Sequence, residues 1–246
     1  MPTQKKISIV VPFHNEERNV PVLYQEIVEV MDGITPDYEM VFVDDKSTDR
    51  TAEIAGRYAD SVIVHTGKTT IAAGRNRGAG AATGEYLVFI DADVEIPEPD
   101  RFFERALACF DRDPKLVGLT VNLRVFPGLA TWADNLVFGT VNLVHQFNNN
   151  VLHHGSASGE FQMAKTDVFR TLGGYREDLS VAEDNEFFAR LARVGRTRCE
   201  PTLTVLHTSR RAHRIGWPKL LYEWLRNALW LAVFKRSASK EWTSIR

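Results

Sequence analysis

The stretch Tyr86-Leu87-Val88-Phe89-Ile90-Asp91-Ala92-Asp93-Val94-Glu95 decides the fold expected of this sequence. Its apolar, β-favouring residues run without interruption into two aspartates that are separated by one small residue. A short, continuous apolar run between turn signals is typical of a strand buried on both faces of a parallel sheet. Because ligands of open α/β sheets bind beyond the carboxyl ends of the strands, Asp91 and Asp93 are predicted to lie in a binding crevice. Carboxylates at that place suit a hard cation that bridges the phosphates of a ligand.

Apolar runs of strand length alternate with helix-type segments on both sides of this stretch. Strands are expected at 7–11, 38–43 and 62–64, and a helix at about 20–31, where apolar residues recur at helical spacing. Further along, we expect helices at 102–110, 132–147, 183–194 and after a capping Thr166, and strands at 117–121, 161–164 and 203–207. This alternation predicts an α/β fold with a mostly parallel central sheet sandwiched between helices.

Composition narrows the class of protein. The chain is 44% hydrophobic and 25% charged, which is ordinary globular usage and excludes disordered and fibrous classes. A formal charge of −2 gives no reason to expect a nucleic-acid partner. Cys109 and Cys199 form neither a disulfide framework nor a metal-binding spacing, and no run reaches the roughly 18 apolar residues that span a bilayer. We therefore expect a cytoplasmic protein.

A second acidic pair, Asp44-Asp45, follows the strand at 38–43. Two strands would thus deliver carboxylates to one edge of the sheet, where a base N–H or ribose hydroxyls can donate to them. The alternative is a turn in which Asp44 and Ser47 satisfy backbone amides and the turn caps the next helix. The pattern alone leaves both interpretations open.

The glycine-spaced run at 74–84 also has two interpretations. It lacks the Gly-Lys-Ser/Thr of a phosphate-binding loop and precedes a strand, so it matches no nucleotide fingerprint. It can be a helix made slim by glycine and alanine for close packing. Alternatively, Arg75 and Arg77 can reach a diphosphate as bidentate donors.

Two further candidates lie in the second half of the chain. Glu183-Asp184 opens a predicted helix, where acidic residues either stabilise the helix dipole or provide a general base at the mouth of the site. His207 ends an apolar strand and can complete a metal site begun by Asp93, although a lone histidine is often structural.

In this order, the motifs resemble those of family 2 glycosyltransferases from about residue 7 to residue 207. The matching segments are Val11-Pro12-Phe13-His14-Asn15-Glu16-Glu17, Val43-Asp44-Asp45-Lys46-Ser47-Thr48-Asp49, Arg75-Asn76-Arg77-Gly78, Asp91-Ala92-Asp93, Gly173-Gly174-Tyr175-Arg176-Glu177 and Glu183-Asp184. The resemblance implies a GT-A fold, a nucleotide-diphosphate sugar donor, Mg²⁺ or Mn²⁺ as cofactor, and transfer with inversion to a glycan or polyprenyl-linked acceptor. The N-terminal half is also similar to polyprenyl-phosphate sugar transferases.

The resemblance also assigns roles to individual residues. It implies that Asp184 is the catalytic base, that Asp93, Asp91 and His207 hold the metal, and that Glu183 and Glu160 lie on the acceptor side. It places the nucleotide-sugar contacts at Pro12, His14, Glu16, Asp44, Arg75 and Asp91. His14 replaces the commoner tyrosine and Lys46 the commoner glycine or asparagine, so the identity of the nucleotide base stays open.

Two other functions compete with sugar transfer. A haloacid-dehalogenase-type phosphohydrolase uses Asp-x-Asp after a strand, but that motif belongs to its first strand and is followed by Gly-Thr, whereas Val94-Glu95 follow here. The other is a non-catalytic nucleotide-sugar binding protein descended from an enzyme. Retention of Asp91, Asp93 and Asp184 together argues against it.

The predicted organisation is a catalytic domain at 1–215 and a basic, aromatic tail at 216–246. Within the domain, about 1–115 would form the nucleotide-sugar half and about 116–215 the acceptor half. The tail places apolar residues on one helical stripe flanked by cations and tryptophans, which fits a helix lying in a membrane interface on the inner face of the membrane. The alternative is a helix docked on the catalytic domain or on a second subunit.

Overall fold

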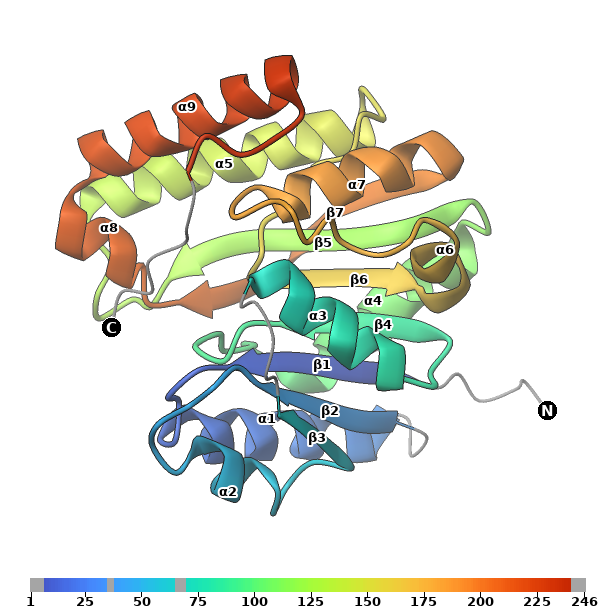
Figure 1. Cartoon of the computed structure of the whole chain (residues 1–246). Helices are drawn as coiled ribbons and strands as arrows, with labels where there is room; N and C mark the ends of the chain where they lie inside the picture. Colours follow the sequence, from blue (N-terminus) through green and yellow to red (C-terminus); the bar gives the residue numbers. More distant parts are fainter. Residues whose placement is uncertain (1–6, 35–37, 65–69, 240–246) are drawn as a thin grey trace.

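The computed structural model describes residues 7–34, 38–64 and 70–239, and its centre is one seven-stranded sheet (Figure 1). The strands are β1 (Ile7–Phe13), β2 (Tyr38–Asp44), β3 (Ser61–Val64), β4 (Tyr86–Ile90), β5 (Leu116–Val125), β6 (Phe161–Lys165) and β7 (Arg196–His207). Their order in the sheet is β3-β2-β1-β4-β6-β5-β7. All pairs are parallel except those of β6, which runs antiparallel between β4 and β5. The predicted mostly parallel sheet is confirmed.

Helices cover both faces of this sheet. They are α1 (Asn19–Ile34), α2 (Thr51–Ala55), α3 (Ile71–Ala81), α4 (Pro99–Arg112), α5 (Trp132–Asn150), α6 (Thr166–Thr171), α7 (Glu183–Val194), α8 (Arg210–Ile215) and α9 (Trp217–Phe234). One apolar core joins the sheet to α1, α4 and α5, and a second joins the other face to α3, α6 and α7. The predicted sandwich of helices around the sheet is therefore confirmed.

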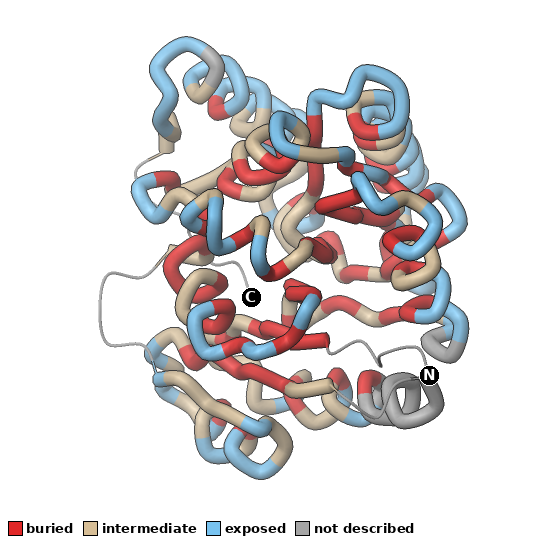
Figure 2. Tube along the Cα trace, turned by 90° about the vertical axis from the view of Figure 1, so that its right-hand side faces the viewer, coloured by how far each residue is buried: buried red, intermediate tan, exposed pale blue. Residues whose placement is uncertain are grey.

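Alternation along the strands explains why there are two cores. Val88 and Ile90 of β4 point into the first core, whereas Leu87 and Phe89 point into the second. All five residues of β4 are buried, as a strand covered on both faces requires. Figure 2 shows buried segments at the centre of the molecule and exposed residues on the outer turns of the surrounding helices.

Two local expectations differ from the structure. Thr166 does not cap α6 but is its first residue, and its hydroxyl donates to the Gly84 carbonyl instead. At α2 the N-cap residue Arg50 makes no side-chain cap, and the carboxylate of Asp49 accepts from the Thr51 amide instead. Strands from before and after residue 115 belong to the same sheet. The predicted division of the domain into a nucleotide-sugar half and an acceptor half stays a prediction.

The glycine-spaced run forms helix α3, as its packing interpretation predicts. A Cβ at Gly78 would lie 2.3 Å from Cγ1 of Val10 and 3.0 Å from Cγ2 of Val43, so the helix approaches β1 and β2 too closely for any side chain. Gly80, on the same helix, has no neighbour within 4 Å of such a Cβ. The close approach at Gly78 brings Arg75, one turn earlier, to the edge of the sheet.

These two glycines give a matched test of the packing. Gly78→Ala should lower the free energy of unfolding by about 1–3 kcal/mol, because overpacking a tight contact costs that much. Gly80→Ala should leave it unchanged or raise it by up to about 1 kcal/mol, because alanine favours the helix. Denaturant unfolding of both variants checks this, and equal stability of the two would contradict the close approach.

Candidate active site

The Asp-x-Asp motif lies just beyond β4, at the carboxyl edge of the parallel strands. β6 runs beside β4 in register Ile90↔Phe161, so the residue before β6, Glu160, lies next to Asp91. The Asp91 amide donates to the Glu160 carbonyl at 3.4 Å. The antiparallel strand therefore adds a third carboxylate to the two that the motif supplies.

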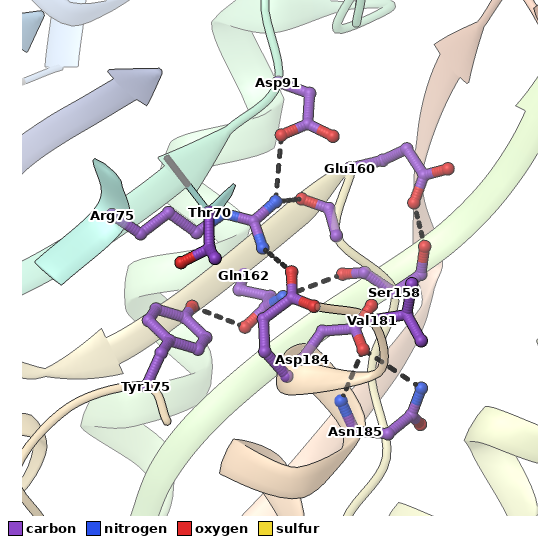
Figure 3. Close-up of polar contacts among 12 residues, drawn as sticks. Thr70, Arg75, Asp91, Ser158, Glu160, Gln162, Tyr175, Val181, Asp184 and Asn185 are labelled. Carbon is purple, nitrogen blue, oxygen red and sulfur yellow. Dashed lines mark hydrogen bonds and ion pairs between the residues drawn. The ribbon is translucent and has the colours of Figure 1, made fainter. Parts of the chain in front are cut away.

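Arg75 is the centre of this carboxylate cluster (Figure 3). Its side chain is 1% exposed, and its guanidinium donates to Oδ1 of Asp91 at 2.9 Å and to Oε1 of Glu183 at 3.0 Å. It also donates to the Gly159 carbonyl at 2.8 Å and lies over the Tyr175 ring. One buried cation thus joins the end of β4 to the start of α7. Its predicted contact with a diphosphate stays a prediction.

Glu183 and Asp184 enter the site from the first turn of α7. Glu183 is 6% exposed and bonded to Arg75, whereas Asp184 is half-buried and bonds only to Asn185 among the described residues. Asp184 is therefore the carboxylate of the pair that can meet a ligand. Burial raises the pKa of both, and that of Glu183 is raised further by the adjacent Asp184 charge.

Burial also changes the protonation of the neighbouring groups. Together with the charge of Asp91, it raises the pKa of Glu160 to about 8. Burial raises the pKa of Asp91 as well, although Arg75 opposes the shift. Four acidic side chains therefore share one site with a single buried arginine, and their raised pKa values mean that a further cation would favour their ionised forms.

Asp93 meets residues from beyond β7. An isolated antiparallel bridge between Glu95 and Leu206 holds the segment after the motif against the end of that strand. Oδ2 of Asp93 then accepts from Thr208 Oγ1 at 3.1 Å and from Arg210 at 2.8 Å, and Arg210 also lies 3.4 Å from Oε1 of Glu16. An open pocket borders Asp93, Thr208 and Arg210. Sequence reasoning missed Arg210 as a site residue, because only the chain path after β7 places it there.

His207 lies close to this site in its neutral form. Burial lowers its pKa to about 4, its Nδ1 is 4.0 Å from Oε1 of Glu160, and its ring packs edge-on against Phe138. Its Nε2 is buried without a hydrogen-bond partner in the described part of the chain.

The acidic residues at this edge of the sheet can hold a divalent cation only if a bound substrate supplies further oxygen ligands. Within the described ranges, no group of three His, Cys, Asp or Glu side chains is arranged to hold a metal ion. The predicted set of Asp91, Asp93 and His207 is thus not a preformed metal centre, and the role of each toward a metal stays a prediction. Two carboxylates are nevertheless enough for Mg²⁺, which is commonly bound by one or two of them together with substrate phosphates.

The predicted nucleoside contacts lie at the ends of β1 and β2. Pro12 pairs with Val43 in the sheet, and Nδ1 of His14 lies 2.6 Å from the Asp45 carbonyl. The Glu16 amide donates to Thr51 Oγ1 at 2.8 Å. Asp44 is 3% exposed; its Oδ2 accepts from the Ser47 amide at 3.3 Å, as the turn interpretation expects.

The other oxygen of Asp44 keeps the nucleoside interpretation open. Its Oδ1 is buried without a hydrogen-bond partner among the described residues, which leaves an acceptor for a ligand. In the same turn, Lys46 has φ of 59°, a left-handed conformation that glycine or asparagine adopts more readily. This conformation fits glycine or asparagine as the commoner residue at this place, and lysine adopts it here all the same.

Asp134 anchors the segment that carries Arg210. It is 1% exposed, forms a capping box with Thr131 at the start of α5, and accepts from Ser209, His213 and Trp217 at 2.8–3.2 Å. Burial raises its pKa, but the bonds from Thr131 and His213 outweigh this and hold the pKa at about 2. Sequence analysis missed this residue, whose only signal is the capping box.

Solved structures of other proteins share this fold. A mannosyltransferase from Pyrobaculum calidifontis in complex with GDP-Man and Mn²⁺ matches with a TM-score of 0.66 and 20% identity, over 84% of this chain and 58% of that one. Glucosyl-3-phosphoglycerate synthase from Mycobacterium tuberculosis, in complex with Mn²⁺, UDP and its product, matches with a TM-score of 0.62 and 18% identity, over 94% and 80%. The fold is that of the GT-A glycosyltransferases.

The family model described as Glycosyl transferase family 2 matches residues 8–173, and the chain belongs to this family. The predicted family is confirmed, and the phosphohydrolase alternative is wrong.

Curated relatives agree with this assignment. The succinoglycan biosynthesis protein ExoA of Rhizobium meliloti is 29% identical over 196 residues, 76% of this chain and 58% of the relative. An undecaprenyl-phosphate 4-deoxy-4-formamido-L-arabinose transferase of Photorhabdus laumondii is 33% identical over 101 residues, 38% of this chain and 30% of the relative. The chain thus covers less than two thirds of either protein. The predicted resemblance to polyprenyl-phosphate sugar transferases is also confirmed.

The Asp134 anchor predicts a pH-dependent stability. Because its pKa is lowered on folding, its carboxylate stabilises the protein above the ordinary pKa of 3.8, and this contribution is lost as the pH falls toward 2. Asp134→Asn should lower the free energy of unfolding by about 2 kcal/mol at pH 5, and the difference from wild type should shrink by about 1 kcal/mol at pH 3.

Denaturant unfolding at the two pH values measures both effects. Asp178→Asn, which removes an exposed ion pair with Arg176, is the control and should cost less than about 1 kcal/mol. If the free energies of unfolding of Asp134→Asn and wild type differ by the same amount at pH 5 and pH 3, the proposed stabilisation by the Asp134 carboxylate is wrong.

Proposed function

We propose that this protein transfers a sugar from a nucleotide-diphosphate sugar to an acceptor hydroxyl with inversion, using a divalent cation and Asp184 as general base. The observation that carries the proposal is the convergence on Arg75 of Asp91 from the end of β4 and of Glu183, the neighbour of Asp184, from α7. A carboxylate that would serve the donor and one that would serve the acceptor therefore lie close together at one edge of the sheet.

The donor would lie along the carboxyl ends of β1, β2 and β4. Asp44, with its unpartnered buried oxygen, would accept from the base or ribose. Asp91 and Asp93 would hold Mg²⁺ or Mn²⁺, which would offset the negative charge that grows on the departing nucleoside diphosphate. Arg210 already lies beside Asp93 and would add a second positive charge at this place. The two matched structures with Mn²⁺ support a divalent cation.

The acceptor would approach from the α7 side. Asp184 would take the proton of the acceptor hydroxyl as its oxygen forms a bond to the anomeric carbon and the bond to the diphosphate breaks. Attack from the face opposite the leaving group inverts that carbon. Glu183, through its ion pair with Arg75, would hold in place the first turn of α7, which carries Asp184. Glu160 would line the acceptor side.

The proposed acceptor is a glycan or a polyprenyl-linked molecule. Relatives named as undecaprenyl-phosphate and dolichol-phosphate sugar transferases match 38% and 37% of the chain, which supports a lipid-linked acceptor. A phosphate acceptor is already ionised at neutral pH and needs no base, so the behaviour of an Asp184 variant separates it from a hydroxyl.

Two substitutions test the proposed roles. Asp93→Ala and Asp184→Asn should each reduce transfer by about 100-fold or more, since a general base alone contributes 10²–10⁴-fold. Both variants should keep the wild-type melting temperature. Only Asp184→Asn should still bind the donor with Mn²⁺, and a chelator should abolish wild-type turnover.

The assay is transfer from a panel of nucleotide sugars, chosen by thermal shift with Mn²⁺, with donor binding measured by calorimetry. Wild-type turnover by Asp184→Asn would point to a phosphate acceptor and contradict the proposed base. Donor binding by the wild type without hydrolysis or transfer would favour the non-catalytic binding protein.

We also propose that α5 and α9 form a surface that rests on an anionic lipid bilayer, so that the protein is peripheral to a membrane. Both helices expose apolar side chains at helical spacing: Trp132, Leu136, Leu143 and Phe147 on α5, and Leu221, Leu225, Leu229 and Val233 on α9, each at least 42% exposed. Lys219 precedes this stripe of α9, and Lys235 and Arg236 follow it. These positive charges would attract anionic lipid headgroups. No helix in the described ranges is long and apolar enough to cross a bilayer.

A pair of charge substitutions tests this surface. Leu225→Glu with Leu229→Glu should lower partitioning onto anionic vesicles at least about tenfold, because two exposed apolar side chains that would insert into the bilayer become negatively charged. Val194→Glu, at a similarly exposed position at the end of α7, is the control and should partition as the wild type does.

Co-sedimentation with anionic and zwitterionic vesicles gives the readout. Unchanged partitioning of the double variant would contradict the bilayer contact. A dimer without vesicles that the double variant dissociates would instead show that this surface binds a second copy of the chain.

A further inference from the structure

The chain turns back on itself after α9. Lys235 has φ of 57°, a left-handed conformation that ends the helix, and the residues that follow return along it. The side chain of Asn227, 6% exposed, holds this returning segment, because its Oδ1 accepts from the amides of Ala238 at 3.1 Å and Ser239 at 3.0 Å. Its Nδ2 donates to Ser239 Oγ at 3.0 Å.

Ser237 connects the returning segment to the loop before α7. Its hydroxyl accepts from the amides of Ser180 at 3.1 Å and Val181 at 3.3 Å and donates to the Val181 carbonyl at 3.0 Å. One side chain thus satisfies three backbone groups of a loop that lies 56 residues earlier in the sequence.

This loop leads directly to the proposed base. Ala182 follows Val181 in a left-handed conformation, φ 64°, and α7 then begins with Glu183 and Asp184. No side chain caps the start of α7, since alanine at the N-cap position has no hydrogen-bonding group. Arg75 therefore contacts the first turn of α7 through Glu183, and Ser237 holds the two residues that come just before Ala182.

We propose that Ser237, held in place by Asn227, is a positioning residue that fixes Asp184 for proton removal from the acceptor. This inference rests on the proposed function, in which Asp184 is the base. Without the Ser237 hydroxyl, the loop at 180–182 loses three hydrogen bonds, and the first turn of α7, which carries Asp184, can shift. A misplacement of about 1 Å far from the reacting atoms can cost about 100-fold in rate, so even a modest loosening of the loop should be measurable.

The kinetic test uses Ser237→Ala, Ser237→Thr and a control in the same segment. Ser237→Ala should lower kcat about tenfold or more while the KM for the donor and the melting temperature stay at wild-type values. Ser237→Thr keeps the hydroxyl and should restore turnover. Ser239→Ala removes a neighbouring hydroxyl that, among the residues that the structure describes, bonds to Arg226 and Asn227 but not to the loop before α7, and it should behave as the wild type does.

Amide hydrogen exchange of the segment 178–186 measures the contact of Ser237 with this loop independently of activity. Ser237→Ala should speed exchange of the Ser180 and Val181 amides, and Ser239→Ala should not. Turnover by Ser237→Ala equal to that of Ser239→Ala would overturn the proposal, as would lost turnover with unchanged exchange. If Asp184→Asn keeps full turnover, the proposed base is wrong and the positioning role falls with it, whereas the exchange rates still show whether Ser237 holds the loop.

Discussion

The ion pairs of Arg75 with Asp91 and Glu183 are the interaction on which the rest of the site depends. Arg75 is covered on all sides, so its charge costs desolvation energy that only well-placed partners can offset. The two carboxylates come from positions 16 and 108 residues further along the chain. Removing the cation would leave buried acidic groups facing one another. The arginine thus joins the end of β4 to the start of α7, where donor and acceptor chemistry would meet.

The position of Arg75 follows from packing one helical turn away. Helix α3 can bring this side chain to the sheet edge only because Gly78 lets its backbone approach Val10 and Val43. The antiparallel strand β6 supplies the neighbouring Glu160, and the bridge between Glu95 and Leu206 brings the end of β7 to Asp93. The topology of the chain therefore brings several acidic side chains together at one place. Burial, together with repulsion from the neighbouring carboxylates, raises the pKa values of Glu160 and Asp91.

Sequence reasoning predicted the parts of this site that local patterns encode. Asp44, Asp91 and Asp93 follow apolar runs, and parallel strands bring such ends to a common edge, so their proximity could be anticipated. Arg210 and Asp134 could not be anticipated in the same way. Their roles depend on the path of the chain after β7, which no periodicity or spacing describes. Ser237 lies even further from the motifs, in a short polar segment that reads as an ordinary tail.

A double-mutant cycle on Arg75 and Glu183 tests the central claim most directly. Unfolding free energies would be measured for Arg75→Met, Glu183→Gln and the double variant. The buried ion pairs predict a cost of about 3–5 kcal/mol for Arg75→Met alone, because Asp91 and Glu183 both lose their partner, and a smaller cost in the Glu183→Gln background, where only Asp91 loses a charged bond. Additive costs would contradict the claim that this pair holds the two sides of the site together.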